Sequence, residues 1–304
     1  MGSKKVKISN DVWIPVSDRD LVTVTKMGHI TELQYLEKMN SKPTILKLSA
    51  DQYMVLSTGE IFDIEKTEKR VENTTSLRKT FKKMRYLINN NFQGLKNELF
   101  VTLTFAPDSS GWRPSVADTD YLAKCFKRFL RLIKNKYGSV DFIRVLEPHE
   151  DGKAHYHVLL RFNDFKSIYI SNSDFSDIWK NGFVTVHSLK DVDNIGAYVS
   201  SYFTDIELND KTYKDMLNSN DANKEVVEKG GKKFIKGGRL QYYPTGVQIY
   251  NKSKGILMPE REVMSYKKAK KIAGSDQPTF EKNYLIESDS FSNKMRIESY
   301  NSKR

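Results

Sequence analysis

Hydrophobic and polar residues in the middle of the chain alternate with two different periods. Residues 98–105, 140–147, 153–162 and 183–189 alternate with a period of two, which is typical of β-strands with one buried face. Residues 120–138, 173–182 and 191–208 place apolar side chains three and four positions apart, as amphipathic helices do. The resulting order β-α-β-β-α-β-α predicts an α+β domain with a ferredoxin-like antiparallel sheet and helices on one face.

The segments on either side carry weaker patterns. Residues 1–74 predict short strands with one helix at 31–39, and residues 75–92 predict an amphipathic helix with Ser76 as its N-cap. From about residue 260 the sequence is polar and charged, which predicts one helix followed by a loose, partly disordered tail. We therefore expect three regions, at 1–94, 95–210 and 211–304.

The strand at 153–162 places two histidines on one face. Because side chains alternate along a strand, His155 and His157 point the same way, together with Leu159 and Arg161. The opposite face is an apolar stripe of Ala154, Tyr156, Val158, Leu160 and Phe162. Two neighbouring imidazoles can seat a divalent metal ion. The alternative is a pair of partly exposed histidines on a half-buried strand.

A carboxylate on the preceding strand completes a possible ligand set. Glu147 ends the strand at 140–147, and a turn at 148–152 leads into the histidine strand. If the two strands form a hairpin, Glu147 lies close to His155 or His157. Two histidines and one carboxylate, with positions left open for water or substrate, suit Mn²⁺, Mg²⁺ or Zn²⁺. His149 and Glu150 in the turn are alternative ligands.

The last helix of this region carries two tyrosines. Tyr198 and Tyr202 are four positions apart, so they lie on the same side of the helix, at the edge of its apolar stripe. They are either packing residues at a helix edge or a pair of phenol nucleophiles that attack a phosphodiester. Thr102 and Thr104 point away from the apolar stripe of their own strand, and we treat them as ordinary strand surface.

Charge points to an anionic partner. Fifty Lys and Arg residues against 38 Asp and Glu residues give a net charge of +12, which favours nucleic-acid binding. Residues 229–259 contain six lysines and Arg239 but no acidic residue. Lysines can neutralise phosphates, and tyrosines can stack on unpaired bases. The predicted DNA-binding residues are Lys232, Lys233, Lys236, Arg239, Tyr242 and Tyr243. The alternative is a solvated basic loop.

Several classes of protein are disfavoured by what the sequence does not contain. A single cysteine, Cys125, excludes an intrachain disulfide and a cysteine-based zinc site. There is no apolar run of 18 residues and no apolar region of a signal peptide, so we expect a cytoplasmic protein without membrane contact. No GxxxxGK[ST] motif is present, so we expect a separate helicase to unwind DNA.

Together these motifs resemble the HUH endonuclease superfamily, and within it the rolling-circle replication initiators of plasmids, integrative elements and phages. FVTLTF is similar to the family's first motif strand, EPHEDGKAHYHVLL to its metal motif and NIGAYVSSYFTD to its tyrosine motif. The tyrosines follow the histidines, as in initiators, whereas conjugative relaxases carry the tyrosine first. RKTFKKMRYLINNNF and KGGRLQYYPTG also resemble stretches in replication proteins of Gram-positive mobile elements.

The resemblance implies roles for individual residues. His155 and His157 would bind Mn²⁺ or Mg²⁺ with Glu147 as third ligand. Tyr198 or Tyr202 would cut one DNA strand, leaving a 5′-phosphotyrosine and a free 3′-OH that primes synthesis. Relatives often carry a lysine three residues after a nucleophilic tyrosine, whereas Ser201 and Asp205 stand there in this chain. Which tyrosine acts first stays open, and we favour Tyr198.

The implied function is site-specific nicking and rejoining of single-stranded DNA that initiates and terminates rolling-circle replication. Residues 95–210 would be the catalytic domain, residues 1–94 a DNA-recognition or supporting region, and residues 211–304 a basic segment. The partners would be single-stranded DNA, the origin duplex and a host helicase. The alternatives are a transposase or mobilisation nuclease with the same chemistry, and a non-catalytic DNA-binding repressor on the same fold.

If the basic stretch grips DNA, charge reversal there weakens binding. We expect the double variant Lys232→Glu with Lys236→Glu to bind DNA less tightly and with a flatter salt dependence, because fewer counterions are released. Binding isotherms at several salt concentrations measure both effects. Unchanged affinity of the double variant would contradict the assignment.

Overall fold

The chain folds into two compact units that interleave along the sequence. The computed structural model describes residues 7–9, 12–39, 43–49, 51–64, 74–149, 151–190, 192–204, 206–207, 226–229, 232–235, 242–275, 277–288 and 291–303. One unit combines Met1–Thr67 with Pro259–Arg304, and the other is Glu68–Met258. The histidine and tyrosine motifs both fall in the second unit. The division of roles at residues 94 and 210 stays a prediction.

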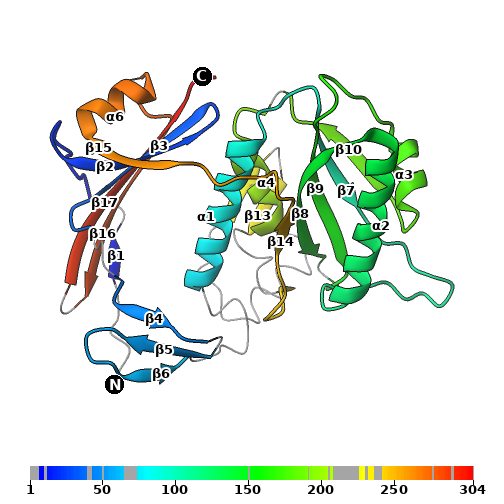
Figure 1. Ribbon diagram of the computed structural model, residues 1–304, viewed down its shortest axis with the longest axis horizontal. Coiled ribbons are helices and arrows are strands. Elements are labelled where there is room, and N and C mark those ends of the chain that lie inside the picture. Colours follow the sequence, from blue (N-terminus) through cyan, green and yellow to red (C-terminus); the bar gives the residue numbers. More distant parts are fainter. Residues whose placement is uncertain are drawn as a thin grey trace. The chain divides into compact units, whose positions relative to one another are not determined.

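A five-stranded antiparallel sheet forms the centre of the unit Glu68–Met258 (Figure 1). Its strands are β7 (Glu98–Leu103), β8 (Val140–Pro148), β9 (Ala154–Phe162), β10 (Val184–Ser188) and β14 (Tyr250–Lys252). The spatial order is β10-β7-β9-β8-β14, so the first four strands adopt the order 4-1-3-2 of the ferredoxin-like arrangement. The predicted fold class is therefore confirmed.

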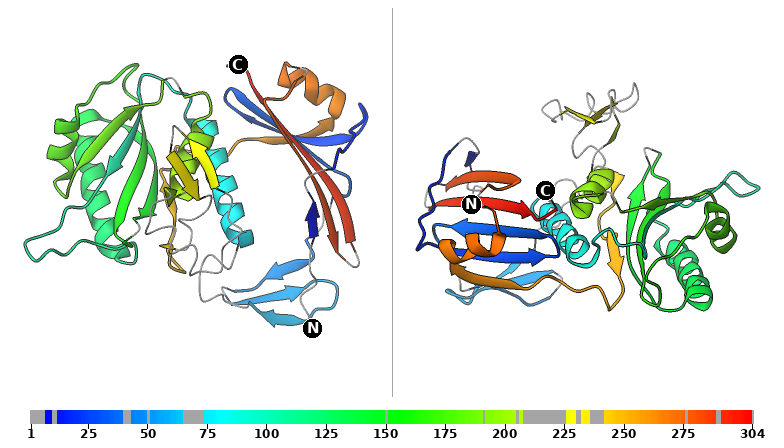
Figure 2. Two further views of the ribbon diagram at one scale, coloured as in Figure 1. Left: turned by 180° about the vertical axis from the view of Figure 1, so that it is seen from behind. Right: turned by 90° about the horizontal axis from the view of Figure 1, so that it is seen from above.

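Two helices cover one face of this sheet, as the sequence predicts. Helices α2 (Thr119–Tyr137) and α3 (Asn172–Trp179) lie on the same face of the sheet (Figure 2). They pack on the even-numbered side chains of β9, which include Tyr156, Val158 and Leu160. Phe129 and Trp179 meet edge to face between the two helices, with ring centroids 5.8 Å apart. This apolar layer fixes which face of β9 is left for the histidines.

Two further helices cover the opposite face, which the prediction of helices on one face did not include. Helix α1 (Thr74–Asn91) and helix α4 (Ile195–Thr204) bury Leu159, Ile143 and Phe100 of the sheet together with their own apolar residues. The face needs this cover because its strands carry apolar as well as polar side chains. Ser76 lies inside α1 and is not the N-cap, since the helix begins at Thr74.

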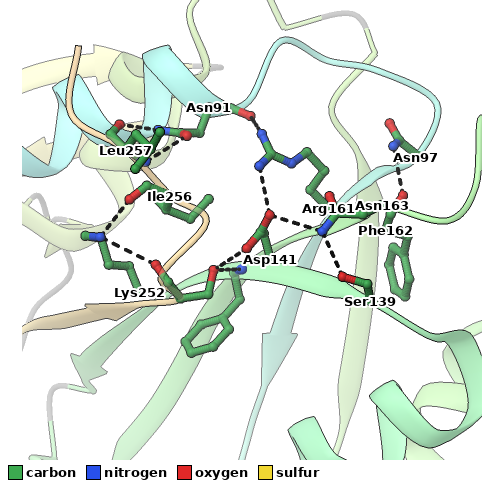
Figure 3. Close-up of polar contacts among 12 residues, drawn as sticks. Asn91, Asn97, Ser139, Asp141, Arg161, Phe162, Asn163, Lys252, Ile256 and Leu257 are labelled. Carbon is green, nitrogen blue, oxygen red and sulfur yellow. Dashed lines mark hydrogen bonds and ion pairs between the residues drawn. The ribbon is translucent and has the colours of Figure 1, made fainter. Parts of the chain in front are cut away.

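A polar network ties the end of α1 to the edge of the sheet (Figure 3). Arg161 donates to the carbonyl oxygen of Asn91 and to Oδ2 of Asp141, both at 2.9 Å. Ser253 donates to the other oxygen of Asp141 at 2.7 Å, and Asn91 exchanges two hydrogen bonds with the backbone of Leu257. Burial acts to raise the pKa of Asp141, but the hydrogen bonds from Arg161, Ser253 and Asn163 hold it below its ordinary value.

A six-stranded antiparallel sheet forms the core of the other unit, with helix α6 (Tyr266–Ala273) packed on it. In spatial order the strands are β1 (Lys7–Ser9), β16 (Phe280–Ser288), β17 (Phe291–Asn301), β3 (Ile30–Leu36), β2 (Leu21–Met27) and β15 (Arg261–Ser265). The remaining described strands form two smaller sheets, one in each unit. One unites β4 (Ile45–Lys47), β5 (Gln52–Val55) and β6 (Ile61–Asp63), and the other unites β11 (Ile206–Glu207), β13 (Lys232–Ile235) and β12 (Val226–Lys229).

The structure corrects two local predictions in the six-stranded sheet. The helix predicted at 31–39 is instead the strand β3, which pairs with β2 across a two-residue turn where Gly28 has φ of 60°. The loose tail predicted after residue 260 contains β16 and β17, which pair with each other and with β3 and β1. Pairing on both sides of β17 supplies hydrogen bonds that local composition does not reveal.

Buried polar residues explain why the end of the chain looks too polar to fold. Arg296, Glu298 and Tyr300 alternate along β17 and therefore share one face. Glu298 accepts hydrogen bonds from Tyr266 at 2.8 Å and Tyr300 at 2.7 Å, and it pairs with Arg296 at 2.6 Å. Each charged group thus has a partner, so the strand can be buried without leaving a charge unpaired. None of the described helices is long and apolar enough to cross a membrane.

The network around Asp141 gives a testable stability prediction. We expect Arg161→Met to lower the free energy of unfolding by about 1–3 kcal/mol at neutral pH, because a charged hydrogen-bond partner is lost. The lowered pKa of Asp141 means that its stabilisation is present above the unfolded value of about 3.9 and is lost as the pH falls through the folded value. The difference between wild type and variant should therefore shrink in acid. Urea unfolding at pH 7 and pH 3 measures both effects.

A surface pair provides the matched control. Lys136 and Asp174 are 3.5 Å apart with about half of each side chain exposed. Lys136→Met should leave the unfolding midpoint unchanged, since exposed ion pairs contribute little. An equal loss of stability in both variants would contradict the role of the Asp141 network.

Candidate functional site

The β8–β9 hairpin brings the predicted ligands together. In its register Glu147 lies opposite His155, and Val145 lies opposite His157. All three candidate ligands point to the sheet face that α1 and α4 cover, since the other side chains of β9 pack under α2 and α3. The hairpin and the proximity that the sequence predicts are both present in the structure.

The three side chains converge on one point. Oε2 of Glu147 lies 2.8 Å from Nε2 of His155 and also contacts Nε2 of His157, while the two Nε2 atoms are 3.0 Å apart. The three residues are only 3%, 5% and 6% exposed for Glu147, His155 and His157. Their ligand atoms are the group within the described part of the chain that could hold a metal ion.

The spacing of the donor atoms fits a divalent ion. Ligands at about 2.1 Å from an octahedral cation lie about 3.0 Å from one another, which matches the two histidine nitrogens. Two neutral nitrogens and one carboxylate oxygen also form a donor set that Mn²⁺, Mg²⁺ or Zn²⁺ accepts. The three side chains could therefore hold a divalent ion.

The electrostatics of the cluster keep its carboxylate ionised. Burial acts to raise the pKa of Glu147, but the adjacent His157 and His155 lower it more, and the result lies well below the ordinary value. An ionised carboxylate at this depth favours a cation beside it, either a proton on an imidazole or a metal ion.

Two residues beside the histidines were missed by the sequence analysis as parts of the site. Thr102 lies opposite His157 in the β7–β9 pairing, and its hydroxyl hydrogen-bonds with Nδ1 of His157 at 3.1 Å. Phe100 stacks on the same imidazole, with ring centroids 5.4 Å apart and planes inclined by 11°. A partner at Nδ1 fixes the ring so that Nε2 faces the cluster. The signal that could have found Thr102 is its place on the polar face of β7.

Helix α4 presents Tyr198 beside this group. The ring of Tyr198 meets the edge of Phe100 at 6.3 Å, so Phe100 contacts both Tyr198 and His157. Tyr198 is 36% exposed, whereas its neighbours Ile195 and Val199 are fully buried. This position at the edge of the helix's apolar face agrees with the sequence analysis. Position 202 lies one turn further along α4, and its side chain is outside the described residues.

A close approach between α4 and α1 fixes where Tyr198 sits. The backbone N–H of Gly196 donates to Oδ1 of Asn89 at 2.7 Å in a buried hydrogen bond. A Cβ atom at position 196 would lie 2.5 Å from the same oxygen, so only glycine fits between the helices. The glycine two residues before Tyr198 therefore sets the distance between the tyrosine helix and α1.

The alternative ligands have different positions. The ring of His149 lies beside that of His155, with centroids 4.2 Å apart, but His149 is exposed and stands outside the group whose donor atoms converge. Glu150 lies outside the described residues.

The predicted DNA-binding residues are placed only in part. Lys233 is exposed on β13, and Tyr242 is half-buried. Tyr243 is 2% exposed in the apolar cluster with α1 and α4, so its ring packs in the core and has no free face for a base. This corrects the prediction for Tyr243. The side chain of Lys232, and Lys236 and Arg239 as a whole, fall outside the described residues.

Metal binding at the cluster can be tested through stability. A ligand present at 100 times its Kd stabilises the folded chain by about 2.7 kcal/mol, so Mn²⁺ should raise the Tm of the wild type. We expect Glu147→Gln to abolish this rise, because the carboxylate that neutralises the ion is lost. His149→Gln should keep it. Thermal unfolding with and without Mn²⁺ is the measurement.

The two variants separate the possible ligand sets. A rise in Tm that survives Glu147→Gln would remove Glu147 from the site. Loss of the rise in His149→Gln would add His149 to it.

Comparison with known proteins relates part of the chain to a protein family. No curated protein matches the chain. Residues 98–207 match the family model described as replication-associated protein ORF2/G2P. The matched segment begins with β7, contains the buried cluster of Glu147, His155 and His157, and ends after α4. The match confirms, for this segment, the resemblance to replication proteins that the motifs predicted.

Proposed function

We propose that the chain nicks and rejoins a specific site in single-stranded DNA through a tyrosine, and so initiates and terminates rolling-circle replication. The observation that carries this proposal is the neighbourhood of Tyr198 and the buried cluster of His155, His157 and Glu147, which Phe100 connects. It is supported by the match of the same segment to replication-associated proteins.

The residues of the cluster would hold Mn²⁺ or Mg²⁺. When bound, such an ion polarises a phosphoryl oxygen as a Lewis acid. Glu147 supplies the negative charge, the two Nε2 atoms supply neutral ligands, and Thr102 and Phe100 hold the ring of His157 in place. Because these ions take more than three ligands, a phosphate oxygen and water would supply the rest.

The proposed reaction is a transesterification that conserves the number of phosphate ester bonds. The phenol oxygen of Tyr198 forms a bond to phosphorus, and the bond from phosphorus to the 3′ oxygen breaks. The phenol loses its proton and the 3′ oxygen gains one, so the products are a 5′-phosphotyrosine and a free 3′-OH. Rejoining is the reverse reaction. A second tyrosine at position 202 would let a new strand be cut while the first is still attached.

The DNA itself would be held by basic residues. The net charge of +12 supplies attraction to phosphates, and Lys233 is exposed on β13. Lys232, Lys236, Arg239 and Tyr242 complete the proposed contacts in this segment. Because the sequence carries no nucleotide-binding loop for a motor, unwinding would depend on a separate helicase.

The nucleophile can be identified by trapping the covalent product. We expect wild type, incubated with Mn²⁺ and labelled single-stranded DNA from its own gene and flanks, to form an adduct that survives denaturation. Tyr198→Phe should reduce the adduct by at least tenfold, and the double variant with Tyr202→Phe should abolish it. Tyr198→Phe keeps the ring contact with Phe100, so the loss reports on the hydroxyl.

Tyr169→Phe is a matched control, because Tyr169 is 90% exposed and lies on a different segment. It should form adduct at the wild-type level. If wild type binds DNA but forms no adduct on any fragment, the repressor alternative replaces the nuclease. If the double variant still forms adduct, another residue is the nucleophile.

A further inference from the structure

A second site lies beside the sheet, in the groove between α1 and the edge strand β14. The groove has a volume of about 830 Å³. Lys79, Thr80 and Lys83 line it from α1, and Tyr250, Lys252 and Lys254 line it from β14 and the residues that follow. All of these residues belong to the unit Glu68–Met258.

The walls of the groove are positively charged on both sides. Lys79 and Lys83 are four positions apart and exposed, so they point from the same side of α1. Lys254 is exposed on the opposite wall. Lys252 is held in place, since its ammonium donates to the carbonyl oxygen of Ile256 at 2.6 Å. Among the described residues that line the groove there is no acidic side chain.

The groove lies beside a line of residues paired across the sheet that includes His157 of the candidate metal cluster. Tyr250 of β14 lies opposite Val145 of β8, which lies opposite His157 of β9. Residues opposite one another in an antiparallel sheet share a face, so Tyr250 lies on the same face as His157, two strands away. Two strand spacings are about 10 Å. A DNA strand is longer than this, so one strand can contact both places.

We propose that this groove binds the phosphodiester backbone of DNA next to the cleavage site. The inference rests on the proposed function, because it takes DNA as the substrate. Four lysines that converge from two elements on one concave surface concentrate positive potential, which attracts phosphates more strongly than separate lysines on a convex surface. The side chain of Tyr250 adds a contact that suits a sugar-phosphate chain.

The ordinary explanation of these lysines is that they solubilise the surface. Helix α2 offers the comparison, because Lys124, Lys127 and Lys134 are exposed on it and none of them lines the groove. If charge alone mattered, substitution of three lysines in either place would weaken DNA binding equally. The proposal instead requires that substitution of the groove lysines alone weakens DNA binding.

The test compares two triple variants of the full chain. One is Lys79→Gln, Lys83→Gln and Lys254→Gln in the groove, and the other is Lys124→Gln, Lys127→Gln and Lys134→Gln on α2. Fluorescence anisotropy with labelled single-stranded and duplex oligonucleotides gives the affinity over a range of salt concentrations. In the groove variant the plot of log association constant against log salt should become flatter. The magnitude of its slope should decrease by about 0.7 per lysine for single strands or about 0.9 for duplex. The oligonucleotide that shows this decrease identifies the form of DNA bound.

The control variant should keep the wild-type slope and affinity. Equal losses in both variants, no loss in the groove variant, or no DNA binding by wild type would each overturn the proposal. The covalent-adduct assay separates this outcome from that of the proposed function. Adduct formation without an effect of the groove variant rejects the groove alone, and a groove effect without any adduct rejects the nuclease alone.

Discussion

The pairing of β8 with β9 is the constraint on which the rest of the site depends. A shift of the register by one residue would turn every side chain of β9 to the other face. His155 and His157 would then lie under α2, and Tyr156 and Val158 would lie under α1. The apolar layer beneath α2 and α3 prevents this shift, because it accepts only the apolar face of the strand. The cluster of candidate metal ligands is thus fixed by hydrophobic packing on the opposite side of the sheet.

The second apolar layer, formed with α1 and α4, buries the candidate metal ligands. Helices α1 and α4 cover the face that carries Glu147 and the two histidines, so these three side chains are almost completely withdrawn from water. Charges interact more strongly in such surroundings, which is why the imidazoles can lower the pKa of the carboxylate despite its burial. The same helices leave Tyr198 partly exposed at the rim. The proposed function would use both features, the buried ligand group and the partly exposed Tyr198.

The sequence predicted the features that depend on the periodicity of hydrophobic residues along one strand. It missed the features that depend on which strands lie side by side. The faces of β9 and the proximity of Glu147 could be predicted, because strand alternation and a short turn determine both. The cover by α1 and α4, and the contact of Thr102 with His157, could not, because strand order decides them. In the other unit, β3 and β17 become strands through neighbours far away along the chain, and ion pairs such as Arg296 with Glu298 let polar residues be buried. Local composition contains neither kind of information.

The contact between Gly196 and Asn89 would affect the length of DNA between the lysine groove and the cleaved bond. It locks α4 directly onto α1, and the first half of α1 forms one wall of the lysine groove. The hydroxyl of Tyr198 and the phosphates in that groove would therefore be held by the two sides of a single helix. The protein would then set the length of DNA between the phosphates bound in the groove and the bond that is cut. Under the proposed function, α1 would set this length, because the contact of Gly196 with Asn89 fixes α4 against α1.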